Sequence, residues 1–166
     1  MGLDGAQLRY GVIKGWETAV KISVPIGASE VFPAGGAFVK NDGSGRMEVA
    51  GDGTALLAGF CIAEDDLDAG QSYSTASSTE GATKGLWIPY YAMGSVVVRL
   101  PVTGGTYVAT MVGQTCDIEV VSNVQGAQLD ASAEDTVIIV GGDLVNNDWV
   151  DLMLNDVKIT GLTGVA

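Results

Sequence analysis

Histidine is absent from this chain of 166 residues, and basic residues are few. Without histidine the sequence lacks the commonest general base and the commonest ligand for transition metals, which removes most hydrolase triads and zinc sites. Eight lysines and arginines stand singly against twenty acidic residues, giving a formal charge of -12. A surface of that sign repels phosphate backbones and anionic lipid headgroups. We therefore expect neither nucleic acid nor a membrane as a partner.

Long apolar runs and helical periodicity are also missing. No apolar stretch approaches the ~18 residues that a membrane-spanning helix requires, and the N-terminus lacks the basic and apolar regions of a signal peptide. We expect a protein without membrane anchor or secretion signal. Charged residues make up only 17% of the chain, below the roughly 25% typical of soluble domains. So few charges are typical of a protein that works inside an assembly.

Cysteine is scarce as well. Cys61 and Cys116 lie far apart in the sequence, each within an apolar, strand-like segment, and neither belongs to a CxxC pair. A disulfide between them stays open, but two buried free thiols are the simpler interpretation.

Glycine, by contrast, is abundant: 24 residues lie mostly in turns between short apolar segments. Residues 30–66 show this pattern best and predict three short strands. The cluster from Lys40 to Arg46 contains asparagine, aspartate and glycine, which suit the sharp turn of a hairpin. In the strand that follows this turn, Met47 and Val49 alternate with polar residues, as expected when one face is buried.

The third strand of this stretch, residues 55–62, is apolar on both faces. One face carries Leu57 and Cys61, and the other carries Leu56, Phe60 and Ile62. Such a strand is central in a two-layer structure, or its outer face meets a partner.

Turn signals recur along the rest of the chain and separate further short apolar segments. We expect strands at 18–24, 94–102, 106–112, 116–121, 136–140, 149–154 and 157–160. Within 116–121, Ile118 and Val120 should face inward and Asp117 and Glu119 outward. The polar segment 71–80 should form a surface loop, and no fixed-length repeat can be aligned by eye.

These patterns predict an all-β fold, a compact antiparallel β-barrel or sandwich of about nine to eleven short strands with extended terminal arms. Residues 1–17 would form an N-terminal arm, which must lie against its own domain or a neighbour. Residues 18–155 would form one β domain with one core, and residues 156–166 a C-terminal strand or arm.

Several short motifs resemble reactive or binding sites, but each has a simpler structural interpretation. Asn41, Asp42, Ser44 and Glu48 loosely resemble a calcium loop, yet the register and the helical flanks of that motif are absent. The glycines of 43–45 and 141–142 lack the lysine and the helix of a phosphate-binding loop. Hairpin turns explain both.

Carboxylates and serines are the remaining candidates for catalysis. Asp65, Asp66 and Asp68 could act as paired carboxylates in glycoside hydrolysis, but so close a cluster suits a solvated loop tip better. The serines between residues 72 and 78 have no histidine or nearby lysine to activate them. We predict no catalytic, cofactor-binding or metal-binding residues, no cofactor and no enzymatic activity.

Six aromatic residues are the candidates for contact with a partner or another subunit. They are Tyr10, Trp16, Phe32, Trp87, Tyr90 and Tyr91. Aromatic side chains are enriched at the centres of interfaces, but they also fill cores and cap the ends of barrels. Both interpretations stay open, and Trp87 and Tyr90 are the strongest interface candidates.

The stretch from Glu30 to Ala63 resembles the small β-rich capsid decoration (cement) proteins of tailed bacteriophages. The resemblance lies in the Ala34-Gly35 turn, the following strand that ends in Val39-Lys40, a short hairpin, and the segment from Gly59 to Ala63. The later strand at 95–99 and the closing hairpin at 137–154 are similar in kind.

This resemblance implies a non-enzymatic viral structural protein that binds the outer surface of a mature icosahedral capsid, commonly as a homotrimer. Its partners would be the major capsid protein, whose neighbouring subunits it bridges, and other copies of itself. The acidic charge agrees with a position on the outside of the virion. Two other classes stay open: a carbohydrate-binding β module that presents Trp87, Tyr90 and Tyr91 on one exposed face, and a phage fibre or baseplate protein.

Overall fold

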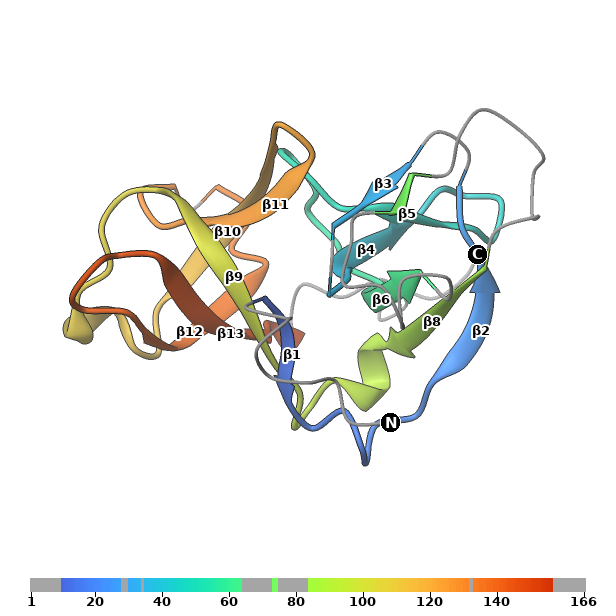
Figure 1. Cartoon of the computed structure of the whole chain (residues 1–166), viewed down its shortest axis with the longest axis horizontal. Coiled ribbons are helices and arrows are strands. Elements are labelled where there is room, and N and C mark those ends of the chain that lie inside the picture. The colour runs from blue at the N-terminus through green and yellow to red at the C-terminus, as the bar shows by residue number, and fades with distance from the viewer. Residues whose placement is uncertain are drawn as a thin grey trace.

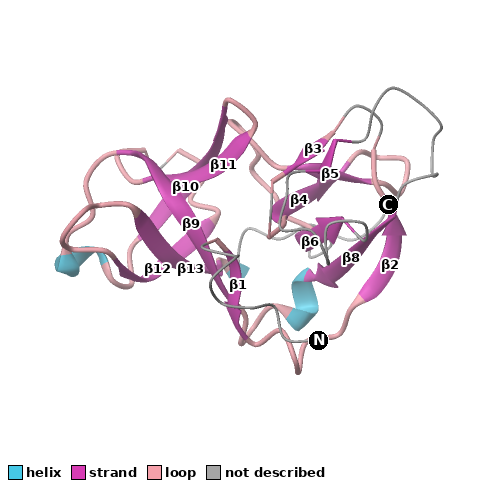
Figure 2. Ribbon diagram, viewed as in Figure 1, coloured by secondary structure: helices cyan, strands magenta, loops and turns pink. Residues whose placement is uncertain are grey.

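The structure is a computed structural model that describes residues 10–27, 30–33, 35–63, 73–74, 84–131 and 133–156. These residues form an all-β protein, as the sequence predicted, with thirteen strands rather than nine to eleven. Within the described ranges, helix is limited to short 3-10 turns such as η2 (Tyr90–Ala92) and η3 (Ala109–Met111). Figure 2 shows strands and loops in both halves of the molecule.

Five strands form a C-terminal barrel. They are β9 (Val97–Gly104), β10 (Thr115–Val121), β11 (Val124–Gln128), β12 (Val137–Gly142) and β13 (Trp149–Leu154). Strand β10 pairs antiparallel with β11 and β12, and β13 pairs antiparallel with β12 and β9. Strand β11 then pairs in parallel with β9, so the pairings close into a ring.

Five earlier strands form an N-terminal barrel. They are β2 (Ile22–Pro25), β4 (Ala37–Asn41), β5 (Met47–Val49), β6 (Gly59–Ala63) and β8 (Lys84–Pro89). Their order is β2-β8-β6-β4-β5. Ile26, directly after β2, bridges Met47 of β5 in parallel and closes this ring too. Figure 1 shows the two barrels side by side.

Three short strands lie outside these rings. Strand β1 (Gly11–Lys14) pairs antiparallel with β9 of the C-terminal barrel. Strands β3 (Val31–Phe32) and β7 (Tyr73–Ser74) pair with each other in a separate two-stranded ladder. Residues 11–14 of the expected N-terminal arm therefore lie on their own chain.

The two barrels repeat one topology. In each, the first strand pairs antiparallel with the fifth, the fifth with the fourth, the fourth with the second and the second with the third, while the third meets the first in parallel. The register agrees as well. Each of the five strand pairings contains a residue pair that matches a pair in the other barrel. The matches, with the N-terminal barrel given first, are these: Pro25–Lys84 with Pro101–Trp149; Phe60–Ile88 with Ile138–Met153; Phe38–Phe60 with Thr115–Ile138; Asn41–Met47 with Ile118–Ala127; and Ile26–Met47 with Val102–Ala127.

Sequence analysis missed this repeat because it lies in the hydrogen-bond register and not in residue identity. The loops between equivalent strands differ in length, and β12 contains a bulge that β6 lacks. A short echo is visible in the sequence, where Val24-Pro25-Ile26 matches Leu100-Pro101-Val102 in kind.

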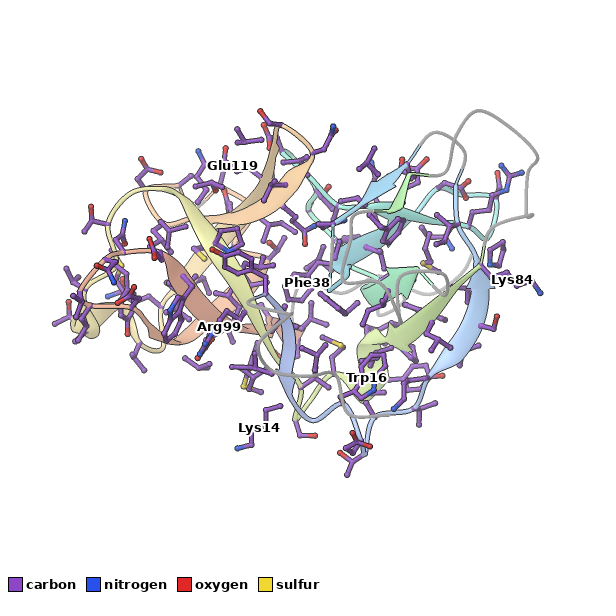
Figure 3. The ribbon with its side chains drawn as sticks, in the orientation of Figure 1. Lys14, Trp16, Phe38, Lys84, Arg99 and Glu119 are labelled. Atoms are coloured by element: carbon purple, nitrogen blue, oxygen red, sulfur yellow. The ribbon has the colours of Figure 1, made fainter. Side chains whose placement is uncertain are left out.

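The expectation of one core is corrected to two. The smaller core fills the N-terminal barrel with eight buried residues, and the larger contains nineteen. The larger core fills the C-terminal barrel and continues onto the outer face of the N-terminal barrel, where Phe38, Phe60 and Ile88 are fully buried. Figure 3 places Phe38 between the two barrels. The N-terminal sheet is thus apolar on both faces, as predicted for the strand around Phe60.

Four details of the predicted strands are wrong. Val120, which was expected to face inward, is 37% exposed. Residues 55–58 precede β6, so Leu57 packs in the larger core and not beside Cys61. The segment 106–112 contains η3 instead of a strand. Asp117 does not face solvent: it is 6% exposed, and its carboxylate accepts hydrogen bonds from the backbone N–H groups of residues 133, 134 and 135 at 2.7–2.9 Å. The predicted strand at 157–160 and the loop at 71–80, apart from Tyr73–Ser74, lie outside the described residues.

Gln125 of β11 joins the two barrels. Its side chain is 1% exposed and inserts between β4 and the residue after β5. The Phe38 N–H donates to Gln125 Oε1 at 2.8 Å, and Gln125 Nε2 donates to the carbonyls of Phe38 at 2.9 Å and Ala50 at 2.7 Å. The amide therefore replaces one rung of the neighbouring barrel's ladder, because every polar group there requires a partner once buried.

Candidate interaction surface

The six aromatic candidates do not form one surface. Phe32 is fully buried in the smaller core, so it is a core residue and no longer a contact candidate. Trp87 is half-buried against the same core, and its Nε1 donates to the Ala58 carbonyl at 3.0 Å. Both residues stabilise the N-terminal barrel. This agrees with the alternative, left open by the sequence, that these aromatic side chains fill a core.

Trp16 and Tyr90 lie beside the larger core, and Tyr91 contacts Tyr90. Trp16 and Tyr90 are half-buried against that core, and Lys21 places its ammonium group 4.7 Å from the centre of the Trp16 ring. Tyr91 is 63% exposed and meets Tyr90 edge to face, at 84° between the rings. Perpendicular rings do not offer the flat platform on which a sugar ring stacks. Tyr10, the sixth candidate, is half-buried.

The residues before β2 are held by close backbone contacts. Gly11 and Gly35 have positive φ angles of 113° and 86°, and a Cβ on Gly35 would lie 2.3 Å from the Tyr10 carbonyl oxygen. Only glycine tolerates both the conformation and the approach. The start of β1, at Gly11, therefore lies against Gly35 of the N-terminal half with no space for a side chain at either position.

Exposed apolar side chains gather instead at one end of the C-terminal barrel. We call this set the barrel-end patch: Val108, Val112, Val140, Leu144 and Val145. Their exposed fractions run from 38% for Val140 to 88% for Val145. They come from two segments, the residues around η3 and the end of β12 with the turn that leads to β13, which Figure 1 shows at the same end of the molecule. A cluster of this kind is typical of a contact surface.

The patch is rigid because hydrogen bonds tie its two segments together. Asn147, with a φ of 57°, accepts from the Tyr107 N–H at 2.7 Å and donates to the Gly105 carbonyl at 3.1 Å. The Gly113 N–H donates to the Ile139 carbonyl at 2.8 Å. Asp143 accepts from the N–H groups of Val145 and Asn146, and these bonds lower the pKa of its carboxyl group. A preorganised surface loses little conformational entropy on binding.

Charge is distributed unequally between the barrels. Residues 97–156 contain nine acidic residues and a single basic one, Arg99. The described residues between 10 and 96 hold five of each sign, and the acidic residues between 64 and 80 lie outside the described chain. The barrel-end patch thus lies on the strongly acidic half of the described structure, which favours a partner with a basic rim.

Arg99 is fixed on the outer side of the C-terminal barrel (Figure 3). Its guanidinium group forms a bidentate pair with Asp151, at 2.7 Å and 3.0 Å, and lies 3.5 Å from the centre of the Trp149 ring. The three side chains are half-buried, and sequence reasoning did not single them out as a group. Their alternation along β9 and β13 was the available signal.

The described residues contain no group of three or more potential protein ligands that could hold a metal ion. In the segment that loosely resembled a calcium loop, Asn41 Oδ1 accepts from the Gly43 N–H, and Asp42 Oδ1 accepts from the Ser44 and Arg46 N–H groups. These oxygens close a hairpin turn, as expected. Asp65, Asp66 and Asp68 lie outside the described residues.

Neither Cys61 nor Cys116 forms a disulfide and both are fully buried, so the interpretation as two buried thiols is confirmed. Burial, together with the charges of Asp117 and Asp135, raises the pKa of Cys116 to about 12. Its thiol therefore stays protonated and unreactive in the folded protein.

Among the described helical turns, none has the length and apolar character needed to cross a bilayer.

Comparison with protein families, characterised proteins and solved structures finds no match to this chain. The class that the described residues define is an all-β protein made of two barrels of equivalent topology, one of which carries an acidic, apolar-ended surface. Its function has to be inferred from that surface.

Proposed function

We propose that the protein decorates and cements the outer surface of an icosahedral viral capsid by bridging neighbouring major capsid protein subunits. The observation that carries the proposal is the barrel-end patch, a rigid apolar surface on a charge-poor, acidic chain. The resemblance of the stretch from Glu30 to Ala63 to bacteriophage decoration proteins supplies the identity of the partner. In this proposal the protein has no catalytic role and no cofactor.

The physics of a shell fits such a contact. One small apolar patch gives a modest affinity, but an oligomer that engages several equivalent sites at once gains affinity through effective concentration. We propose a homotrimer as the bound form. Binding only to the expanded lattice would stabilise that lattice by mass action. An acidic surface suits the outside of the virion because packaged DNA would repel it.

The test is binding to expanded capsids that lack the protein, with bound copies counted by electron microscopy. We expect saturable binding at symmetry-related positions. Leu144→Asp, at a side chain that is 64% exposed, should weaken binding at least about tenfold because it places a charge in an apolar contact. Val121→Asp, also exposed but on the hairpin at the other side of the same barrel, is the matched control and should bind normally.

Two results would remove the proposal. One is the absence of binding to any expanded capsid. The other is equal binding by the Leu144→Asp and Val121→Asp proteins, which would show that the barrel-end patch does not make the contact.

A further inference from the structure

We infer that the protein associates with itself head to tail, through a second use of the contact that joins its own two barrels. The inference deepens the proposed function, on which its biological setting rests, by assigning a surface to the self-association. Its physical basis is the repeated register described above, and its test needs no capsid.

The first half of this contact is an outer row on the second, fourth and fifth strands. In the N-terminal barrel the row is Phe38, Phe60 and Ile88, all fully buried in the larger core. The equivalent row of the C-terminal barrel is Thr115, Ile138 and Met153. These three residues are half-buried, and Ile138 and Met153 belong to neither core.

The second half of this contact consists of residues at and just before the start of the first strand of a barrel. In the C-terminal barrel, Val96 and Val98 are fully buried in the same core as Phe38 and its row. The register makes Ile22 the equivalent of Val98, since each lies three residues before the proline that pairs with the first residue of the fifth strand. Val20 is then the equivalent of Val96. Val20 is 53% exposed and Ile22 37%.

Each half therefore has one copy within the larger core and one copy outside it, where Val20 and Ile22 are exposed and the row of Thr115, Ile138 and Met153 is half-buried. Val20 and Ile22 of one molecule fit the row of Thr115, Ile138 and Met153 on a second, as Val96 and Val98 share a core with the equivalent row within the chain. Neighbouring Arg99, held by Asp151 and Trp149, adds a preorganised border, and arginine and tryptophan are enriched in interfaces. The charge distribution also favours a contact between the N-terminal barrel of one molecule and the C-terminal barrel of the next. A contact between two C-terminal barrels would bring two strongly acidic surfaces together.

A contact between two different surfaces either closes into a ring or continues as a filament. A closed ring would present every barrel-end patch in equivalent positions, as binding around a rotation axis of an icosahedral capsid requires. The inference thus gives the proposed trimer a defined interface.

The experiment is sedimentation of the full chain at concentrations up to about 0.1 mM. We expect the unaltered protein to form a discrete oligomer, and Met153→Lys and Val20→Lys each to be monomeric. An equal mixture of the two variants should form a dimer, because each retains the half that the other has lost. Val121→Lys is the control and should behave like the unaltered protein. Circular dichroism checks that each variant is folded.

Methionine oxidation by dilute peroxide provides a second measurement on the unaltered protein. Met153 should be protected as the concentration rises, whereas Met111 in η3, which is also half-buried, should not change. The inference is overturned if the protein stays monomeric throughout, if the mixture of folded variants stays monomeric while the unaltered protein associates, or if Met153 and Met111 are protected equally. Capsid binding by a monomeric protein would overturn the inference and leave the proposed function standing.

Discussion

The two barrels share strand order and register but differ in what they expose. At the hairpin between the second and third strands, the N-terminal barrel has the polar turn that follows Asn41, whereas the C-terminal barrel extends into an apolar hairpin with a turn at Ser122 and Asn123. That extension carries Gln125 to the other barrel and leaves Val121 and Val124 exposed. These differences between the two hairpins lie on the outer surfaces of the barrels. The shared strand register therefore determines the fold, and the surface side chains determine what each barrel contacts.

The difference in core size is the second part of this comparison. Eight buried residues hold the N-terminal barrel internally, and its outer face depends on the larger core that it shares with the C-terminal barrel. We expect the N-terminal barrel to be the less stable of the two when they are separated, because buried apolar area is the main source of stability.

Removal of the Gln125 amide should have the largest effect. Gln125→Leu leaves the Phe38 N–H and the Ala50 carbonyl buried without a partner, and we expect the free energy of unfolding to fall by about 3 kcal/mol. Urea denaturation followed by tryptophan fluorescence measures it, since Trp87 and Trp149 report one barrel each. Gln114→Leu, at an exposed side chain, is the control and should cost less than about 0.5 kcal/mol. An equal loss in both variants would mean that Gln125 does not join the barrels.

The two cysteines sharpen the comparison because each barrel buries one of them. Under a urea series with iodoacetamide, Cys61 should become alkylated at a lower concentration than Cys116, and Gln125→Leu should widen the interval. The folded state protects Cys116 further by raising its pKa to about 12. Peptide mass spectrometry measures both thiols in one sample. Simultaneous alkylation would show that the barrels unfold as one unit.

The smallest expected effect concerns Glu30, which accepts from the Val49 N–H at 2.9 Å. Burial raises the pKa of this carboxyl group above 4.5, so the folded state holds the proton more tightly than the unfolded state. Its contribution to stability is therefore present at low pH and is lost as the pH rises through the folded pKa. Glu30→Gln should match or exceed the unaltered protein near pH 7, by less than about 1 kcal/mol, and should lose that advantage near pH 4.

Thermal unfolding of the Glu30→Gln and unaltered proteins at both pH values measures this difference. Backbone N–H donors lower the pKa values of Asp42 and Asp143, so these groups lose stabilising effect as the pH falls. Both proteins retain them, and their effect cancels in the comparison. An advantage of the variant that grows toward pH 4 would contradict the assignment.

Local patterns in the sequence were sufficient for the fold class, the hairpin after Asn41, the closing hairpin of β12 and β13, and the free thiols. These features depend on alternation and turn chemistry, which short windows contain. The repeat, the insertion of Gln125 and the burial of Asp117 depend on pairings between residues distant in the sequence. A polar residue in a strand looks exposed until the backbone groups that it binds are known.

The site was less predictable than the fold for the same reason. Aromatic character drew attention to Phe32 and Trp87, which the N-terminal barrel buries or half-buries. The barrel-end patch consists of valines and one leucine in segments separated by a whole strand pair, and each looked like a core residue by composition. Exposure is a property of the assembled barrel and not of the side chain.

The pairing of β1 with β9 has a consequence for synthesis of the chain. Residues 11–14 leave the ribosome early, but their partners at 97–99 are made only after the whole N-terminal barrel. Residues 11–14 must therefore wait without their β9 partner while the N-terminal barrel folds behind them, and long-range pairing of this kind is slow. The pairing of β1 with β9 would be among the last events of folding, so a nascent chain halted before residue 97 should leave residues 11–14 open to proteases.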